Sequence, residues 1–167
     1  AWRNAIWFSQ ARTSTLRRVM RTEGGIDVDA LREGKRLVFC TLDPRTIGMR
    51  EIGPSIVSTS PELNNMASTL ANLFRGHPPN ATMVVVEIPI AALNEDDDDL
   101  YKDLYRIKGL CEAHRALLMV VVNERTLTDI ARTVLEGMCE TVARAQGADT
   151  LIINALSGER SGEVKIE

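Results

Sequence analysis

Two carboxylates stand where predicted strands end. Asp43 follows the strand predicted over residues 36–42, and Glu87 lies near the end of the strand predicted over 82–88. Ligands of open α/β sheets bind beyond the carboxyl ends of the strands, so both acids are candidate catalytic residues. The alternative for Asp43 is a plain turn formed with Pro44. The alternative for Glu87 is a strand-end carboxylate that is hydrogen-bonded to loop amides.

A stretch of hydroxyl side chains with one arginine precedes the first predicted helix. Arg12, Thr13, Ser14 and Thr15 follow the short apolar run at residues 4–8. A helix N-terminus attracts anions, so these four residues are candidate nucleotide-binding residues. The stretch has no glycine and no lysine, whereas a phosphate loop needs glycines to bring backbone N–H groups around phosphates and a lysine to reach the terminal ones. It therefore predicts weak phosphate binding.

The first 21 residues contain five arginines and no acid, with aromatic side chains between them. Such a mixture is typical of single-stranded nucleic acid binding and equally of protein interfaces, where Trp and Arg are enriched. The alternative without a binding role is a terminal helix with a solvated arginine face. An acidic run at residues 95–99 has the opposite charge, which suggests head-to-tail self-association. The candidate partner-binding residues are Trp2, Arg3, Trp7, Arg17, Arg18 and Arg21.

No spacing in the sequence indicates a metal site. The three cysteines, Cys40, Cys111 and Cys139, are far apart and form no CxxC pair. They are expected to be buried, reduced thiols in a cytoplasmic protein. The acidic run at 95–99 lacks the spacing of a calcium loop. It is expected to be a solvated helix start that matches the helix dipole.

Composition limits the remaining classes. The chain has 167 residues, 44% of them hydrophobic and 26% charged, which predicts a single compact domain. No apolar run approaches the roughly 20 residues that a membrane-spanning helix needs. The net charge of −3 gives no general attraction to nucleic acid or anionic lipid.

The elements that must position these residues alternate between helix and strand. Apolar side chains at helical spacing predict helices, and short runs that are apolar on both faces predict buried parallel strands. Residues 4–8 are expected to form a strand or to start a helix, and helices are predicted at 13–21, 27–33 and from Ser60 to about Phe74. Strands are predicted at 36–42, 82–88 and 116–122, the last buried on both faces, and the segment at 44–60 is expected to be irregular with a possible short strand at 56–57. Further helices are predicted after Asn94 and from Thr126 to Gly147, followed by an antiparallel hairpin of strands 150–154 and 163–166. This order predicts a three-layer α/β/α fold with a mostly parallel central sheet.

From Arg32 onward the chain resembles the RecA/KaiC-like ATPases, particularly the archaeal KaiC-like proteins and the ATPase of the archaellum motor. Residues 33–43 (EGKRLVFCTLD) resemble a strand that ends in a catalytic acid. Residues 83–93 (MVVVEIPIAAL) resemble a Walker B strand and the segment after it. The resemblance implies a RecA-like fold with ATP or ADP and Mg²⁺ as possible ligands. It assigns the catalytic acid to Asp43 and the Walker B acid to Glu87, although the phosphate loop is absent.

The combined prediction is a degenerate RecA/KaiC-like domain at residues 24–167, onto which an N-terminal segment, 1–23, packs. Its expected role is regulatory or scaffolding: it associates with a protein partner or with itself, and binds nucleotide weakly or not at all. Two alternatives stay open. One is an active nucleotide hydrolase whose phosphate loop lies outside this chain, and the other is a nucleic-acid-binding module that uses the N-terminal arginines.

Overall fold

The computed structural model describes residues 3–90, 92–94, 97–145, 150–155 and 161–165. The chain divides into two compact units, Ala1–Thr126 and Leu127–Glu167. The boundary that the sequence suggested between residues 23 and 24 stays a prediction. Within the described ranges, no helix combines the length and the apolar character that crossing a bilayer requires.

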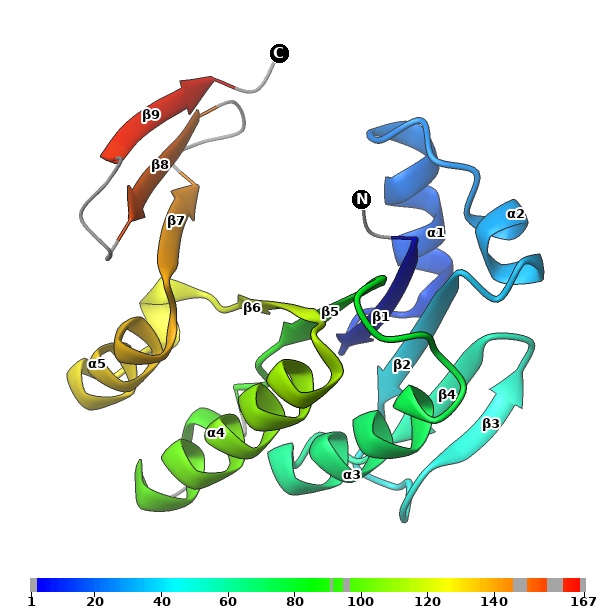
Figure 1. Cartoon of the computed structure of the whole chain (residues 1–167), viewed down its shortest axis with the longest axis horizontal. Helices are drawn as coiled ribbons and strands as arrows, with labels where there is room; N and C mark the ends of the chain where they lie inside the picture. Colours follow the sequence, from blue (N-terminus) through cyan, green and yellow to red (C-terminus); the bar gives the residue numbers. More distant parts are fainter. Residues whose placement is uncertain (1–2, 91, 95–96, 146–149, 156–160, 166–167) are drawn as a thin grey trace. The chain divides into compact units, whose positions relative to one another are not determined.

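A six-stranded sheet forms the centre of the first unit (Figure 1). Its strand order is β3-β4-β2-β1-β5-β6, and every neighbouring pair is parallel except β3 with β4. The predicted mostly parallel sheet is therefore confirmed. The strands are β1 (Asn4–Ser9), β2 (Leu37–Leu42), β3 (Arg50–Gly53), β4 (Ile56–Thr59), β5 (Thr82–Glu87) and β6 (Leu117–Val121).

Helices cover both faces of this sheet, as right-handed crossovers between parallel strands require. Side chains of paired parallel strands point to the same face, and Trp7 pairs with Phe39 on one side and with Val85 on the other. This face packs against the first two helices through Val28 and Leu16. The helices of the first unit are α1 (Thr13–Thr22), α2 (Val28–Glu33), α3 (Leu63–Phe74) and α4 (Asp97–His114).

The opposite face of the sheet carries the larger core. Ile6 and Phe8 of β1 are completely buried, and α3 and α4 lie side by side (Figure 1). These two helices contribute Met66 and Leu104, each 1% exposed. The alternation of β1 therefore divides its side chains between two cores, one on each face.

Several predicted boundaries in the first unit were wrong. In the segment at 44–60, the possible short strand at 56–57 is confirmed as β4, whereas β3, with which it forms a hairpin, was not expected. Because β4 extends through Thr59, α3 begins at Leu63 rather than beside Ser60. Ser60 instead accepts a hydrogen bond from the Glu62 backbone N–H at 3.4 Å.

The strand at 117–121 also departs from its prediction. It was expected to be buried on both faces, but Leu117, Met119 and Val121 are 38%, 47% and 43% exposed. These side chains are exposed because β6 is the last strand of the sheet, whereas the core cluster beneath α1 and α2 is built on β1 and β2.

The second unit joins a helix to a small antiparallel sheet. Its elements are α5 (Asp129–Met138), β7 (Thr141–Ala145), β8 (Thr150–Ala155) and β9 (Ser161–Lys165). The predicted C-terminal hairpin is confirmed as β8 with β9. The predicted helix to Gly147 was wrong, since Cys139 has extended backbone angles (φ −96°, ψ 141°) and ends α5. The helix cap is Thr128, whose side chain accepts from the Ala131 N–H, and not Thr126.

We expect Phe8→Ala to lower the free energy of unfolding by about 3–5 kcal/mol, because it leaves a cavity in the core beneath α3 and α4. Urea unfolding followed by far-UV circular dichroism measures this change. The control is Ile47→Ala, at a side chain that is 99% exposed, which is expected to change stability by less than about 0.5 kcal/mol. Similar losses in both variants would contradict the described core.

Candidate functional site

The strand order places a topological switch point between β1 and β5. From β1 the chain moves outward to β2 and β4, then returns to the other side of β1 for β5 and β6. Open α/β sheets bind ligands in the crevice where the order reverses in this way. Ser9 and Glu87 are the last residues of the two strands that border this point.

The Glu87 carboxylate is held by two side chains of β1. Trp7 Nε1 donates a hydrogen bond to Glu87 Oε1 at 2.8 Å. Ser9 Oγ donates to Glu87 Oε2 at 2.6 Å. Both oxygens therefore have partners within the protein. The bonds cross the switch point itself, because they join the end of β1 to the end of β5.

Some polar groups of the loop between β1 and α1 are paired within the loop and the first turn of the helix. The Ala11 backbone N–H donates to Ser9 Oγ at 3.0 Å. The Arg12 carbonyl accepts from the N–H groups of Thr15 at 2.8 Å and Leu16 at 3.1 Å. A phosphate cradle needs backbone N–H groups that converge on a ligand, and the Ala11 N–H already points to Ser9.

The four candidate nucleotide-binding residues lie together at the start of α1. Arg12, Ser14 and Thr15 are exposed, and no side chain caps the helix. Thr13 Oγ1 lies 3.4 Å from Thr41 Oγ1 of β2. The structure therefore gathers these residues at the carboxyl end of the sheet, where the sequence predicted them, and their role in binding stays a prediction.

The second candidate acid, Asp43, is clamped by the arginine two residues later. Arg45 Nε donates to Asp43 Oδ1 at 3.1 Å and Arg45 Nη2 donates to Asp43 Oδ2 at 2.9 Å. The Arg45 backbone N–H adds a third bond to Oδ1, at 2.9 Å. The Arg45 side-chain bonds, followed by the backbone bond, lower the pKa of Asp43 to about 2.

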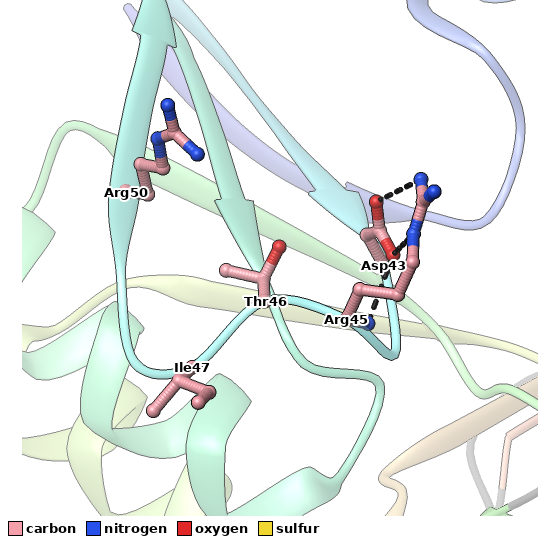
Figure 2. A pocket seen from close by; sticks show the side chains of 5 residues that line it. All are labelled: Asp43, Arg45, Thr46, Ile47 and Arg50. Atoms are coloured by element: carbon pink, nitrogen blue, oxygen red, sulfur yellow. Dashed lines mark hydrogen bonds and ion pairs between the residues drawn. The ribbon is translucent and has the colours of Figure 1, made fainter.

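A hollow of about 490 Å³ lies beside this pair, lined also by Thr46, Ile47 and Arg50 (Figure 2). Arg50 comes from β3 and lies on the other side of the hollow from Asp43 (Figure 2). Thr46 Oγ1 is 2.6 Å from Ser58 Oγ of β4. The Arg50 guanidinium and the Asp43–Arg45 pair thus border an open hollow.

The structure does not bring Asp43 and Glu87 into one cluster. Their strands, β2 and β5, are separated by β1, a spacing of about 10 Å. Each acid also has its own partners, Arg45 in one case and Trp7 with Ser9 in the other. Within the described ranges, no group of three or more His, Cys, Asp or Glu side chains could hold a metal ion.

The N-terminal arginines have different surroundings. Arg17 donates to both oxygens of Asp29, at 2.5 and 2.7 Å, and Arg21 donates to one of them at 3.0 Å. Arg18 is exposed on the same helix and helps to line a second hollow of about 260 Å³. Arg3 accepts a bond from Arg36 Nε at its carbonyl. Trp2 lies outside the described residues.

Three contacts of the site were missed by sequence reasoning. The pair of Asp43 with Arg45 had a local signal, since an Asp two residues before an N–H donor commonly forms an Asx turn. The bonds from Trp7 and Ser9 to Glu87 had no local sequence signal, because they join residues about 80 positions apart. Strand register alone places them opposite one another.

We expect Glu87→Gln to lower the free energy of unfolding by about 1–3 kcal/mol, because the neutral amide cannot accept both charge-assisted bonds as the carboxylate does. Chemical denaturation of the two proteins measures the difference. Glu51→Gln is the matched control on exposed β3, and should change stability by less than about 0.5 kcal/mol. Equal effects at the two positions would argue against the Trp7 and Ser9 bonds.

We expect the Asp43 carboxyl to titrate near pH 2 in an NMR pH titration, and to return toward its ordinary pKa in Arg45→Gln, because Arg45 supplies the causes of the shift. Since the folded-state pKa is lowered, the stabilisation is present above about pH 4 and is lost as the pH falls toward 2. Arg50→Gln lines the same hollow and should leave the Asp43 pKa in place. A return in Arg50→Gln alone would contradict the assignment.

The similarity to known proteins is structural. No protein-family profile matches the chain, and no curated protein sequence does. Among solved structures, the KaiC-like protein PH0186 from the hyperthermophilic archaeon Pyrococcus horikoshii aligns with a TM-score of 0.61 and 15% identity, covering 98% of this chain and 71% of that one. At this identity the likeness concerns the fold alone. The chain therefore has the RecA/KaiC-like α/β fold.

Proposed function

We propose that this chain is a RecA/KaiC-like regulatory or scaffolding domain that works through protein association and does not turn over ATP. The observation that carries the proposal is the engagement of Glu87, which stands at the end of the strand that resembles Walker B. Both carboxylate oxygens accept bonds from β1, at 2.8 Å from Trp7 and 2.6 Å from Ser9. A carboxylate held in this way is a structural bridge across the switch point.

The second acid supports the same proposal. A carboxylate that activates water must have a free oxygen directed at the reacting group. Both Asp43 oxygens are engaged by Arg45, and the lowered pKa makes this carboxylate a weak base. Both acids that the resemblance assigns to catalysis are therefore bound to side chains of the same chain.

The residues at the switch point do not fit a nucleotide with its magnesium ion. The ion would need oxygen ligands, and each Glu87 oxygen already accepts one hydrogen bond, from Trp7 or from Ser9, which leaves only part of its acceptor capacity for a metal. The phosphates would need convergent N–H groups and a lysine, whereas the loop has Gln10, Ala11 and Arg12. Arg12 could hold one phosphate as a point contact, which supports weak binding at most.

The surface of α1 supports an association role. Arg17 and Arg21 share the single carboxylate of Asp29, and Arg32 Nη1 also lies 3.6 Å from it. Three guanidinium groups around one carboxylate leave an excess of positive charge, and exposed Arg18 adds to it. Such a surface complements an acidic partner.

We expect no thermal shift from millimolar ATP with Mg²⁺ beyond that of matched salt, and phosphate release that is unchanged in Glu87→Gln and in Asp43→Asn. A ligand at 100 times its Kd would stabilise the folded state by about 2.7 kcal/mol, which a melting curve resolves readily. Arg12→Gln tests whether any small shift depends on the start of α1.

A nucleotide hydrolase gives the opposite pattern. It would show a clear shift with ATP and a loss of phosphate release in the Glu87 and Asp43 variants, and this result would overturn the proposed function. Glu51→Gln again serves as the control, because it makes the same chemical change on the exposed strand β3.

A further inference from the structure

The β2–β3 segment, residues 43–52, presents large apolar side chains at the surface. Ile47 is 99% exposed, and Met49 and Ile52 are 40% and 53% exposed. Exposed apolar side chains that occur singly need no explanation, whereas a group of them commonly marks an interaction site. Three of them within residues 47–52 therefore make this segment a candidate for binding.

The base of this segment is fixed by polar contacts. The Thr46 backbone N–H donates to the Asp43 carbonyl at 3.0 Å, the hydroxyls of Thr46 and Ser58 are 2.6 Å apart, and Arg45 clamps the Asp43 carboxylate. Gly48 then turns the chain with a φ of +69°, a conformation that glycine adopts without steric cost. A segment that is already ordered loses little conformational entropy when a partner binds.

The hollow beside this segment combines apolar surface with positive charge. Its lining includes Ile47 together with Asp43, Arg45 and Arg50 (Figure 2). Two guanidinium groups and one carboxylate leave one positive charge in excess. In the part of the chain that the structure describes, no acid forms an ion pair with Arg50. The hollow therefore suits one carboxylate that lies next to an apolar side chain.

The hollow is complete within the first unit, because all its lining residues belong to Ala1–Thr126. It also lies far along the sheet from the strand after which the second unit begins. Strands β3 and β6 are the two edges of the six-stranded sheet, and five strand spacings separate them by about 24 Å.

We propose that the β2–β3 segment binds a segment of a partner protein that carries a carboxylate beside an apolar side chain. This inference rests on the proposed association function and names the chemistry of the partner. The carboxylate accepts hydrogen bonds from the Arg50 guanidinium, whose planar fork matches two carboxylate oxygens. The apolar side chain packs on Ile47 and Met49 and removes their surface from water.

The chemistry of the site favours a protein segment over a surface of phosphates. Asp43 stays ionised beside the hollow, because the Arg45 bonds hold its pKa at about 2. Its charge repels the closely spaced phosphates of nucleic acids and anionic lipids, whereas a single carboxylate matches the one excess positive charge. Single-stranded nucleic acid is normally bound by aromatic side chains that stack on bases, and residues 43–52 include no aromatic side chain.

Thiol labelling of the full chain tests whether the segment is accessible. The Ile47→Cys thiol is expected to react with a maleimide reagent nearly as fast in the folded chain as in the urea-unfolded chain. The unsubstituted chain, with its three native cysteines, gives the background. Strong protection of the new thiol would show that another part of the chain covers the segment, and would overturn the proposal.

Backbone amide NMR measures binding, with a short peptide of glutamate, leucine and glycine as the probe. The amide signals of residues 45–52 are expected to move as this peptide is added. Arg50→Gln should weaken binding about tenfold, as loss of an interface arginine commonly does, and Ile47→Ser should also weaken it. Arg75→Gln and Ile90→Ser, at other exposed positions, are the matched controls and should leave the affinity unchanged. Circular dichroism checks that each variant stays folded.

Three further probes test the chemistry of the partner. A glutamate and glycine peptide of the same length should bind more weakly, and phosphatidylglycerol vesicles and a DNA oligonucleotide should leave the signals of residues 45–52 in place. Equal binding of the peptide without leucine overturns the proposal. A stronger response to the vesicles or to DNA overturns it as well, as does no response to the peptide that contains leucine.

Failure of this site is distinguishable from failure of the proposed function. If residues 45–52 respond to none of the probes and ATP with Mg²⁺ also has no effect, the association role stands and only this partner chemistry is rejected. A response to ATP with Mg²⁺ rejects the proposed function, whatever the β2–β3 segment binds.

Discussion

The hydrogen bonds from Trp7 and Ser9 to Glu87 are the interaction on which the account of this fold depends. They join β1 to β5, the two strands between which the direction of the doubly wound sheet reverses. In most sheets of this kind the reversal leaves a crevice for a ligand. Here a half-buried carboxylate needs partners, and it finds both of them on the neighbouring strand. One set of contacts therefore joins the two strands at the switch point and gives each oxygen of the acid a partner.

The same strand register fixes the packing around the site. Trp7 and Ser9 reach Glu87 from the face that packs under α1 and α2. Between them, Phe8 points to the opposite face and is fully buried. A one-residue slip of β1 would exchange these faces. It would bury polar side chains under α3 and α4 and leave Glu87 without donors, so the core and the site require the same register.

Much of the fold could be predicted from the sequence, because buried parallel strands have continuous apolar runs such as TMVVVE in β5. Features that depend on which elements are neighbours in the folded structure could not be predicted from the sequence. The run LLMVV of β6 has the same apolar character as a central strand, yet it lies at an edge. Asp43 and Glu87 were correctly expected at strand ends, but Trp7 as a partner of Glu87 depends on pairing across about 80 residues. The end of α5 at Met138 had a local signal in Gly137, but the prediction extended the helix to the later Gly147.

The most direct test of the account observes the Trp7 indole N–H itself. In a two-dimensional ¹H–¹⁵N NMR spectrum the chain has two indole signals, since it contains two tryptophans, and Trp2→Phe identifies the Trp7 signal. The account predicts that millimolar ATP with Mg²⁺ leaves this signal in place, and that Glu87→Gln moves it strongly. A shift of the Trp7 signal on adding ATP with Mg²⁺, with no change in Glu87→Gln, would show that the switch point is open to nucleotide and would contradict the account.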